Sequence, residues 1–245
     1  MSDTTIVIPT TTGGAKYLER LLPLLQREEC PIIVVDNASQ DNTHEICTKY
    51  SVNNYIRLNQ NLNFSIACNI GAFNVTTRNI LFLNNDIIPL DPFIDKIELD
   101  LLKYSAVGIQ LRFEKDNTLQ HAGIGFYTEG LDARYPYEIR DETLANREGE
   151  TIAVTAACLG IRRDVFYRIN GFHEGYRNGY EDVDLCLKLR ENRFPIFYDG
   201  SIVMQHTHMG TEGRVKDDAF NKELYRVRWL DNSLMLSIAR PHVVN

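Results

Sequence analysis

The strongest constraint on the fold is a regular alternation of short apolar runs with amphipathic segments in the first ninety residues. The apolar runs, expected to be strands, are residues 6–9, 31–36, 55–58 and 79–83. The segments between them repeat apolar side chains at helical spacing and are residues 17–25, 46–50 and 66–75. Fully apolar strands that alternate with helices are typical of a parallel sheet covered on both faces. The sequence therefore predicts an α/β fold with a mostly parallel central sheet.

The pattern is looser after residue 92. We expect helices at residues 93–104, 164–169, 181–191 and 220–238, and strands at residues 106–111, 151–161, 195–198 and 202–204. The short helix at 164–169 is expected to end at Asn170 and Gly171. Residues 114–150 are mixed and allow no assignment. Because no Gly-, Pro- or Ser-rich linker divides the chain, one domain with two halves is predicted.

Composition limits the class of protein. The formal net charge is −7 over 245 residues, with no basic run, which excludes a typical nucleic-acid binder. The five cysteines form no close pair, so we expect buried, reduced thiols rather than a zinc site or a disulfide framework. The first residues do not form a signal peptide, and no apolar run approaches ~20 residues. A cytoplasmic protein is expected.

Two acidic residues stand where a ligand would bind. Asp36 and Asp86 both follow expected strands, and open α/β sheets bind ligands at the carboxyl ends of their strands. Asp86 ends the run Asn84, Asn85, Asp86, which could hold a hard divalent cation through oxygen atoms. The alternative is an ordinary turn, since Asn and Asp are common turn residues after strands.

Two further groups are candidates for chemistry. Glu181 and Asp182 open the helix expected at 181–191 and could present a general base, although acids at a helix start are also explained by the helix dipole. His206 and His208 are two apart after a short strand and would point the same way, as metal-binding imidazoles can. The alternative there is a polar loop. His121 is interpreted as structural rather than catalytic.

Taken in order, these segments resemble glycosyltransferase family 2. The resemblance covers residues 4–211 and is carried by residues 6–10, 34–39, 61–71, 81–86, 171–172 and 181–186. It is similar in particular to the bacterial branch that contains rhamnosyltransferases. The resemblance implies a GT-A fold and an inverting transferase that moves a sugar from a nucleotide-diphosphate donor to an acceptor hydroxyl, with Mn²⁺ or Mg²⁺ as cofactor. UDP-sugars and dTDP-rhamnose both remain open as donors.

The resemblance also implies roles for individual residues. Asp182 corresponds to the general base, with Glu181 as the first acid of that pair. Asp86 corresponds to a metal ligand, completed by His206 or His208. The residues expected at the nucleotide are Pro9, Thr10, Asp36, Asn61, Asn69, Asn84 and Asn85. The chain departs from the family pattern at Asn84, where a DxD motif has its first aspartate, and at Asn63, where relatives often have glycine. Asparagine tolerates the positive φ that such a position requires.

The expected organisation is one GT-A domain. Residues 1–110 would form the donor half, residues 111–215 the acceptor half and residues 216–245 a helical C-terminal segment that packs on the domain. The resemblance implies a glycan or lipid-linked glycan acceptor, synthesis of a bacterial surface polysaccharide, and peripheral contact with the inner face of the membrane. Two alternatives remain: a nucleotidyltransferase, disfavoured by the single lysine in the loop after the first strand, and a non-catalytic nucleotide-sugar binding module of a larger protein.

Overall fold

A computed structural model describes residues 2–129, 133–207 and 214–230 of the chain. Its strands are β1 Thr4–Thr10, β2 Ile32–Asp36, β3 Asn54–Arg57, β4 Asn79–Leu83, β5 Ile87–Pro89, β6 Ala106–Phe113, β7 Leu119–His121, β8 Ile124–Glu129, β9 Ala133–Glu138, β10 Glu148–Thr151, β11 Cys158–Arg162 and β12 Ile196–His206. Its helices are α1 Ala15–Leu25, α2 Thr43–Lys49, α3 Phe64–Phe73, α4 Ile94–Leu101, α5 Arg163–Arg168, α6 Glu181–Glu191 and α7 Arg214–Tyr225. The short helical turns are Gln26–Glu28, Glu142–Leu144 and the π-helical turn Arg226–Leu230.

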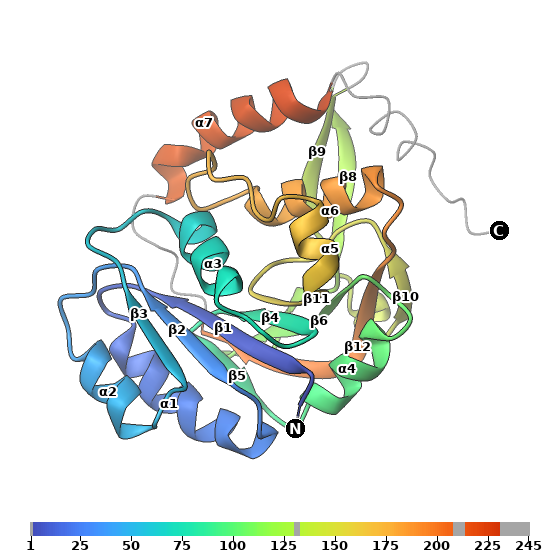
Figure 1. The fold of residues 1–245 in the computed structure, drawn as a ribbon. Coiled ribbons are helices and arrows are strands. Elements are labelled where there is room, and N and C mark those ends of the chain that lie inside the picture. The colour runs from blue at the N-terminus through green and yellow to red at the C-terminus, as the bar shows by residue number, and fades with distance from the viewer. Residues whose placement is uncertain (1, 130–132, 208–213, 231–245) are drawn as a thin grey trace.

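The main sheet has the strand order β10-β12-β6-β11-β4-β1-β2-β3, with β5 paired to β12 and β7 to β6. Strands β4, β1, β2 and β3 run parallel, as the apolar runs predicted. Strand β11 is antiparallel to both of its neighbours, β4 and β6, so the sheet as a whole is mixed. The β8–β9 hairpin forms a separate pair beside α7 at the top of Figure 1.

Helices cover both faces of the sheet because its strands are apolar on both sides. On one face, Ile6 and Ile8 of β1 pack with the buried stripe of α1 and with α2 and α4. On the other face, Val7 of β1 packs with α3, α5 and α6. Figure 1 shows these two layers on either side of the sheet. The amphipathic spacing of α1, with Leu18, Leu21, Leu22 and Leu25 buried, is the reason that this segment folds as a helix against the sheet.

Several expected boundaries were wrong. Strand β1 does not stop at Pro9 but continues to Thr10, since the paired β2 carries the register through Pro9. The strand expected at 151–161 is two separate strands, β10 ending at Thr151 and β11 starting at Cys158. The strands expected at 195–198 and 202–204 are one, because β12 passes a bulge between Asp199 and Val203 without ending.

Local conformation agrees with several expectations. Asn63 has φ 104° and caps α3 by accepting a hydrogen bond from the Ile66 amide at 2.9 Å. Asn170 and Gly171 both have φ 57° and end α5. At the start of α2, Asn42 occupies the N-cap position without a side-chain bond. Asp41 instead accepts a hydrogen bond from the Thr43 hydroxyl at 2.6 Å.

The C-terminal helical segment packs on the domain through a buried carboxylate. Asp184 of α6 is fully buried and accepts hydrogen bonds from Arg228 Nε at 2.7 Å and Trp229 Nε1 at 2.8 Å. The Tyr176 hydroxyl donates to the same oxygen at 3.3 Å. Tyr225 and Trp229 of this segment are buried. The expected helix therefore holds to Leu230, where the description ends.

All five cysteines are free and buried. Burial raises the pKa of Cys30 and of Cys47 to about 12. The thiols therefore act as small core side chains, as the lack of close pairs predicted.

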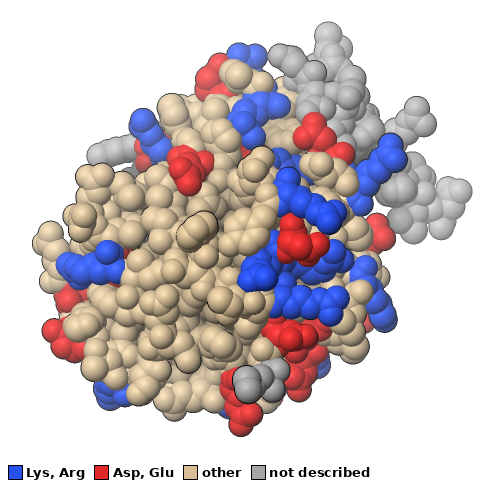
Figure 2. All heavy atoms as spheres, in the orientation of Figure 1, with Lys and Arg blue, Asp and Glu red and all other residues tan. Residues whose placement is uncertain are grey.

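Charged side chains are unevenly spread over the surface. Figure 2 shows Lys and Arg gathered over the region of α5 and α6, with Asp and Glu side chains among them. One such pair is Arg162 with Asp164, at 3.0 Å. Because the signs are interleaved, this face presents a mixed surface rather than a uniformly basic one. No helix among the described residues has the length and apolar character needed to cross a membrane.

A carboxyl pair beneath β10 gives a testable pH effect. Burial and the neighbouring Asp199 carboxylate raise the pKa of Asp100 to about 6. The folded protein therefore binds a proton at Asp100 more readily than the unfolded chain, so this site favours folding more as the pH falls from above 6 towards 4. Asp100→Asn should raise the free energy of unfolding by on the order of 1 kcal/mol at pH 8, after allowance for solvent screening, and by much less at pH 4.5.

Thermal unfolding at the two pH values measures this effect. Asp95→Asn, an exposed change on the same helix, is the matched control and should be neutral at both. Equal melting shifts for Asp100→Asn at pH 8 and pH 4.5 would contradict the proposed carboxyl repulsion.

Candidate active site

The loops that follow β1, β3 and β4 meet at one edge of the sheet. The Asn85 amide donates to the Thr10 hydroxyl at 2.8 Å, and the Asn61 amide donates to the Thr11 hydroxyl at 3.3 Å. Gly14 is required here, since a Cβ at that position would lie 2.2 Å from Thr10 Oγ1. Pro9, Thr10, Asn61 and Asn85 thus belong to one polar rim at the carboxyl ends of the parallel strands, where α/β sheets bind ligands.

Asp36 lies behind this rim rather than on it. Its side chain is fully buried at the end of β2, and it accepts hydrogen bonds from the Ser39 amide at 2.7 Å and from Arg57 Nη1 at 2.7 Å. The Tyr55 hydroxyl donates to it as well. Both carboxylate oxygens are therefore occupied, and Arg57 is the charged group at this corner that reaches solvent.

The side chain of Asn69 is also occupied by hydrogen bonds within the protein. Its amide nitrogen donates to the Phe172 carbonyl at 3.0 Å, and its amide oxygen accepts from the Phe172 amide at 2.9 Å. The same amide nitrogen donates to Glu174 at 3.0 Å. Asn69 therefore fastens α3 to the loop before α6, and its polar atoms are directed at that loop.

Asp86 and His206 form a pair. Asp86 follows β4 and His206 ends β12, and His206 Nε2 lies 3.1 Å from Asp86 Oδ1. On the other side of the ring, His206 Nδ1 lies 2.8 Å from Gln120 Oε1. A carbonyl oxygen only accepts, so Nδ1 carries a proton and Nε2 is the nitrogen that faces the carboxylate. His208 lies outside the described residues.

This pair suits a divalent cation that receives other ligands from a substrate. A carboxylate and an imidazole with its second nitrogen fixed by a hydrogen bond are a common ligand combination. Within the described ranges, no cluster of three or more His, Cys, Asp and Glu side chains is placed to hold a metal. The donors present therefore fit a cation whose remaining positions are filled by phosphate oxygens and water, as Mg²⁺ sites often are.

Asp182 is held at the start of α6. Three successive residues before it, Asn178, Gly179 and Tyr180, have positive φ values of 52°, 153° and 71°. This unusual backbone turns the helix start towards the sheet edge. The partly buried carboxylate accepts hydrogen bonds from the Val183 amide at 2.8 Å and the Ala156 amide at 3.3 Å. Burial, and then the Glu138 carboxylate, raise the pKa of Asp182 above its ordinary value.

A cavity of about 340 Å³ joins these groups. Asn84 and His206 line it from the side of the strand ends, and Glu181 and Asp182 line it from α6. Glu181 is buried and accepts a hydrogen bond from the Gly179 amide, so it also braces the loop before the helix. The structure therefore brings together Asn84, Glu181, Asp182 and His206, with Asp86 joined through His206.

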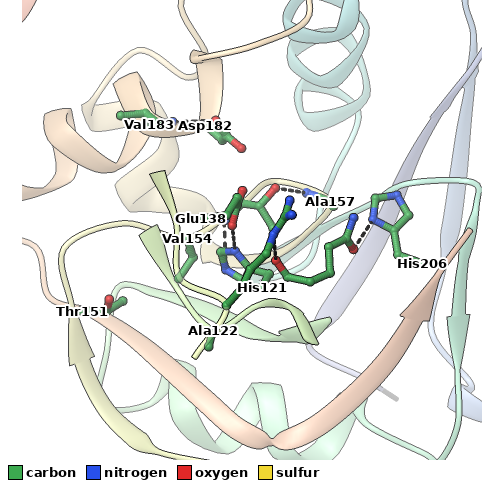
Figure 3. Close-up of polar contacts among 12 residues, drawn as sticks. His121, Ala122, Glu138, Thr151, Val154, Ala157, Asp182, Val183 and His206 are labelled. Atoms are coloured by element: carbon green, nitrogen blue, oxygen red, sulfur yellow. Dashed lines mark hydrogen bonds and ion pairs between the residues drawn. The ribbon is translucent and has the colours of Figure 1, made fainter. Parts of the chain in front are cut away.

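The cavity also has a polar wall that sequence reasoning missed. Gln120 and His121 of β7 and Glu138 at the end of β9 line it, together with Arg140. His121 is 1% exposed and pairs through Nδ1 with Glu138, the contact drawn in Figure 3. The sequence led to its interpretation as a structural residue, and its place in the cavity wall was not foreseen. Residues 114–150 carried no local motif, because strand pairing assembles this wall from separate segments.

Comparison with known proteins identifies the sequence family to which the chain is similar. Residues 5–169 match the model of the family described as "Glycosyl transferase family 2". The chain is 27% identical to the O-antigen biosynthesis protein RfbC of Myxococcus xanthus over 169 residues, which is 64% of this chain and 13% of that protein. It is 26% identical to the rhamnosyltransferase WbbL of Escherichia coli K12 over 212 residues, which is 75% of each chain.

Solved structures share the fold at low sequence identity. The mannosyltransferase PcManGT of Pyrobaculum calidifontis, solved with GDP-Man and Mn²⁺, has a TM-score of 0.67 and 12% identity, covering 93% of this chain and 64% of its own. TarS 1–349 of S. aureus, solved with UDP-GlcNAc, has a TM-score of 0.64 and 17% identity, covering 86% of this chain and 60% of its own. The expected GT-A fold is confirmed by these likenesses.

Proposed function

The chain belongs to glycosyl transferase family 2, and we propose from this premise that it transfers a sugar, with inversion, from a nucleotide-diphosphate donor to a glycan hydroxyl. One observation carries the proposal: Asp182, from α6, lines the same 340 Å³ cavity as Asn84 and His206, which come from the ends of β4 and β12. A base and a diphosphate-binding group must face one reacting carbon from two sides for a single displacement to invert it. The family match also removes the nucleotidyltransferase alternative.

The reaction follows from this arrangement. The acceptor oxygen forms a bond to the anomeric carbon while the bond from that carbon to the diphosphate oxygen breaks, with its electron pair leaving on the diphosphate. The transition state resembles an oxocarbenium ion, as in glycoside hydrolysis. Asp182 takes the hydroxyl proton, and its raised pKa makes it a better proton acceptor than an ordinary aspartate. Glu181 supports this role by holding the loop before the helix.

Asp86 and His206 would hold the divalent cation, Mn²⁺ or Mg²⁺, with His208 as the alternative histidine. When bound, the cation supplies positive charge beside the leaving diphosphate. Gln120 orients His206 for that role through its 2.8 Å contact with Nδ1. The Mn²⁺ present in the structure of PcManGT supports this part of the proposal.

The rim at the strand ends would receive the nucleotide. We place Pro9, Thr10, Asn61, Asn84 and Asn85 along it, with a UDP-sugar or dTDP-rhamnose as the donor. Asp36 would contribute by fixing Arg57, since its own oxygens are already occupied. Asn69 is not assigned a contact with the nucleotide, because its amide is bonded to Phe172 and Glu174. Residues 1–110 are thus proposed as the donor half and residues 111–215 as the acceptor half.

The names of the relatives support a role in a bacterial surface polysaccharide, such as an O-antigen. The acceptor would then be a glycan or a lipid-linked glycan, and the chemistry would take place on the cytoplasmic side of the membrane. The chain spans 13% of the RfbC sequence and 75% of WbbL, so the activity of a whole relative is carried over here only as a proposal.

The test is release of nucleoside diphosphate from a panel of UDP- and dTDP-sugars, with and without glycan acceptors, followed by NMR of the product anomer. Acceptor-dependent release with an inverted product is expected. A folded protein that releases no diphosphate from any donor and acceptor, or a product of retained configuration, would overturn the proposal.

Because only two residues are proposed as metal ligands, we expect the binding of the metal and of the nucleotide to be coupled. Mn²⁺ should bind weakly to the protein alone and at least tenfold more tightly with a nucleoside diphosphate present, because the phosphates complete its ligands. By linkage, Mn²⁺ should raise the affinity for UDP or dTDP by the same factor. Calorimetry with Mn²⁺ and with EDTA measures both, and His206→Ala should abolish the enhancement.

His173→Ala is the matched histidine control, since His173 does not line the cavity and pairs with the amide of Gly175. In His173→Ala, a nucleoside diphosphate should increase the affinity for Mn²⁺ as much as it does in the wild type. Equal enhancement in His206→Ala would remove His206 from the metal site and leave His208 as the candidate.

A further inference from the structure

A second pocket adjoins the cavity and shares Asp182 and Glu138 with it. It has a volume of about 200 Å³ and lies between the β8–β9 hairpin, the loop before α6, and α7. We call it the acidic pocket, because the carboxylates of Glu138, Asp182 and Asp218 all line it. Among the described residues of its wall there is no Lys, Arg or His. The nearby Lys222 lies over the ring of Tyr135, 4.2 Å from its centroid.

Basic side chains distinguish the two spaces. The wall of the 340 Å³ cavity has acidic side chains too, Glu138, Glu181 and Asp182, but it also contains Arg140, His121 and His206, which can face a diphosphate. The described wall of the acidic pocket has three acidic residues and no basic one. Glu138 pairs with His121 on the side of the larger cavity, but Asp182 and Asp218 have no such partner in this wall, so the pocket disfavours an anion. Its carboxylates accept hydrogen bonds, and the side chains of Thr155, Asn178 and Asn221 can also donate them. Both kinds of group suit the hydroxyls of an uncharged ligand.

Tyrosine rings form the apolar part of the pocket. Tyr137 and Tyr180 line it, and Tyr137 is 50% exposed. The Tyr137 ring lies flat against Gly125, where a Cβ would come within 2.6 Å of its Cζ atom. One face of this ring is thus fixed by the backbone of the neighbouring strand, and its exposed part is held in place before any ligand binds. A flat aromatic face beside carboxylates matches a sugar, which has an apolar C–H face and a rim of hydroxyls.

The aromatic surface continues beyond the pocket. Tyr127 is 45% exposed, and its ring centroid lies 6.4 Å from that of Tyr137. The ring of Tyr135 packs between two others. Its centroid lies 6.0 Å from that of Tyr127 and 6.1 Å from that of the buried Tyr225 of α7. This packing fixes the hairpin on α7, so that Tyr137 and Tyr127 form one rigid, partly exposed strip.

From these contacts we propose that the acidic pocket binds an uncharged sugar ring of the acceptor against Tyr137, with the next ring against Tyr127. The acceptor is accordingly a neutral oligosaccharide of two or more rings rather than a monosaccharide, a uronic acid polymer or a phosphate-bearing ring at this position. This inference rests on the proposed function, since it assumes that the hydroxyl attacked near Asp182 belongs to a glycan.

Sugar binding to the intact chain tests the inference without a donor. The probes are neutral trisaccharides of glucose, N-acetylglucosamine, mannose and rhamnose, their monosaccharides, and trigalacturonate as the anionic probe. At least one neutral trisaccharide should bind at least about tenfold more tightly than its monosaccharide in NMR titrations, and trigalacturonate should not show that preference. No preference for any neutral trisaccharide, or equal binding of trigalacturonate, would overturn the inference.

Variants identify the site. Tyr137→Ala should weaken the preferred trisaccharide by about tenfold, and Tyr137→Phe should restore it, because the ring face is retained. Phe73→Ala is the control, since Phe73 is 80% exposed and lines neither space. Asp218→Asn, an exposed change, should lower the discrimination against trigalacturonate even if Tyr137→Ala fails to fold. Unchanged sugar binding in Tyr137→Ala, with unchanged discrimination in Asp218→Asn, would contradict the assignment.

Titration of UDP and dTDP on the same samples separates this inference from the proposed function. If the protein binds a nucleotide but does not prefer a trisaccharide, only the proposal for the acidic pocket is contradicted. If it prefers a trisaccharide, loses that preference in Tyr137→Ala and binds no nucleotide, the proposal for the pocket stands and the transferase proposal is contradicted.

Discussion

Asp182→Asn should lower kcat for sugar transfer by about 10²–10⁴-fold while leaving the affinity for nucleoside diphosphate unchanged. The amide keeps the shape of the side chain but cannot accept the proton of the incoming hydroxyl. The amide oxygen can still accept the 2.8 Å bond from the Val183 amide, and only the longer 3.3 Å bond from the Ala156 amide is lost, so the fold should be kept. Steady-state rates and calorimetry on one preparation measure both quantities.

Glu181→Gln is the matched control because Glu181 lines the same cavity. It should lower kcat far less than Asp182→Asn, since its bond to the Gly179 amide is a positioning contact that the amide oxygen can still accept. The pH profile gives a second check. Because the pKa of Asp182 is raised, transfer should fall on the acid side at a higher pH than an ordinary aspartate would give. An Asp182→Asn variant with more than a tenth of the wild-type kcat would rule out Asp182 as the base.

Asp184→Ala should have the largest effect on stability, a loss of about 3 kcal/mol in the free energy of unfolding. Asp184 is fully buried, and its removal leaves Arg228, Trp229 and Tyr176 without their shared acceptor. Lys188 Nζ, 3.7 Å from the other carboxylate oxygen, loses this charge partner and keeps its bond to the Gly171 carbonyl. Denaturant unfolding measures the change, which should appear in the midpoint.

The control for Asp184 is Asp164→Ala. Asp164 also pairs with an arginine, Arg162 at 3.0 Å, but both side chains are exposed to solvent. This change should lower stability by less than about 1 kcal/mol, because exposed ion pairs are weak. A similar small loss for Asp184→Ala would show that the C-terminal segment is not anchored by this carboxylate.

The donor side of the fold could be predicted closely from the sequence, since each of its elements carries its own signal. The buried run of β4 was expected at the residues where it occurs, and α6 likewise. Asp86 and His206 were expected together only through the family resemblance, and the structure places them 3.1 Å apart. Asp36 was expected to face the nucleotide, but an aspartate at a strand end gives no sign that Arg57 and Ser39 will occupy it.

The contacts on the acceptor side could not be predicted from the sequence, and the reason is physical. The pairing of His121 with Glu138 joins residues of different strands, and neither has a local pattern that specifies the other. The tyrosines of the β8–β9 hairpin lie in the stretch that allowed no assignment, and which of them face one another depends on the register of the hairpin. Contacts of this kind depend on strand pairing, which a periodicity within one segment does not encode.

The position of β11 between β4 and β6 has a consequence for biosynthesis. Strands β1 to β4 are complete once the ribosome has made residue 83, and they can pair with one another at that point. Strands β5 and β6 are made next. The strands that flank β6 in the sheet, β11 and β12, are made much later, at residues 158–162 and 196–206. We therefore expect a nascent chain that folds in two stages, with the edge of β4 open until β11 emerges, and that interval is when such an unpaired edge would need a chaperone.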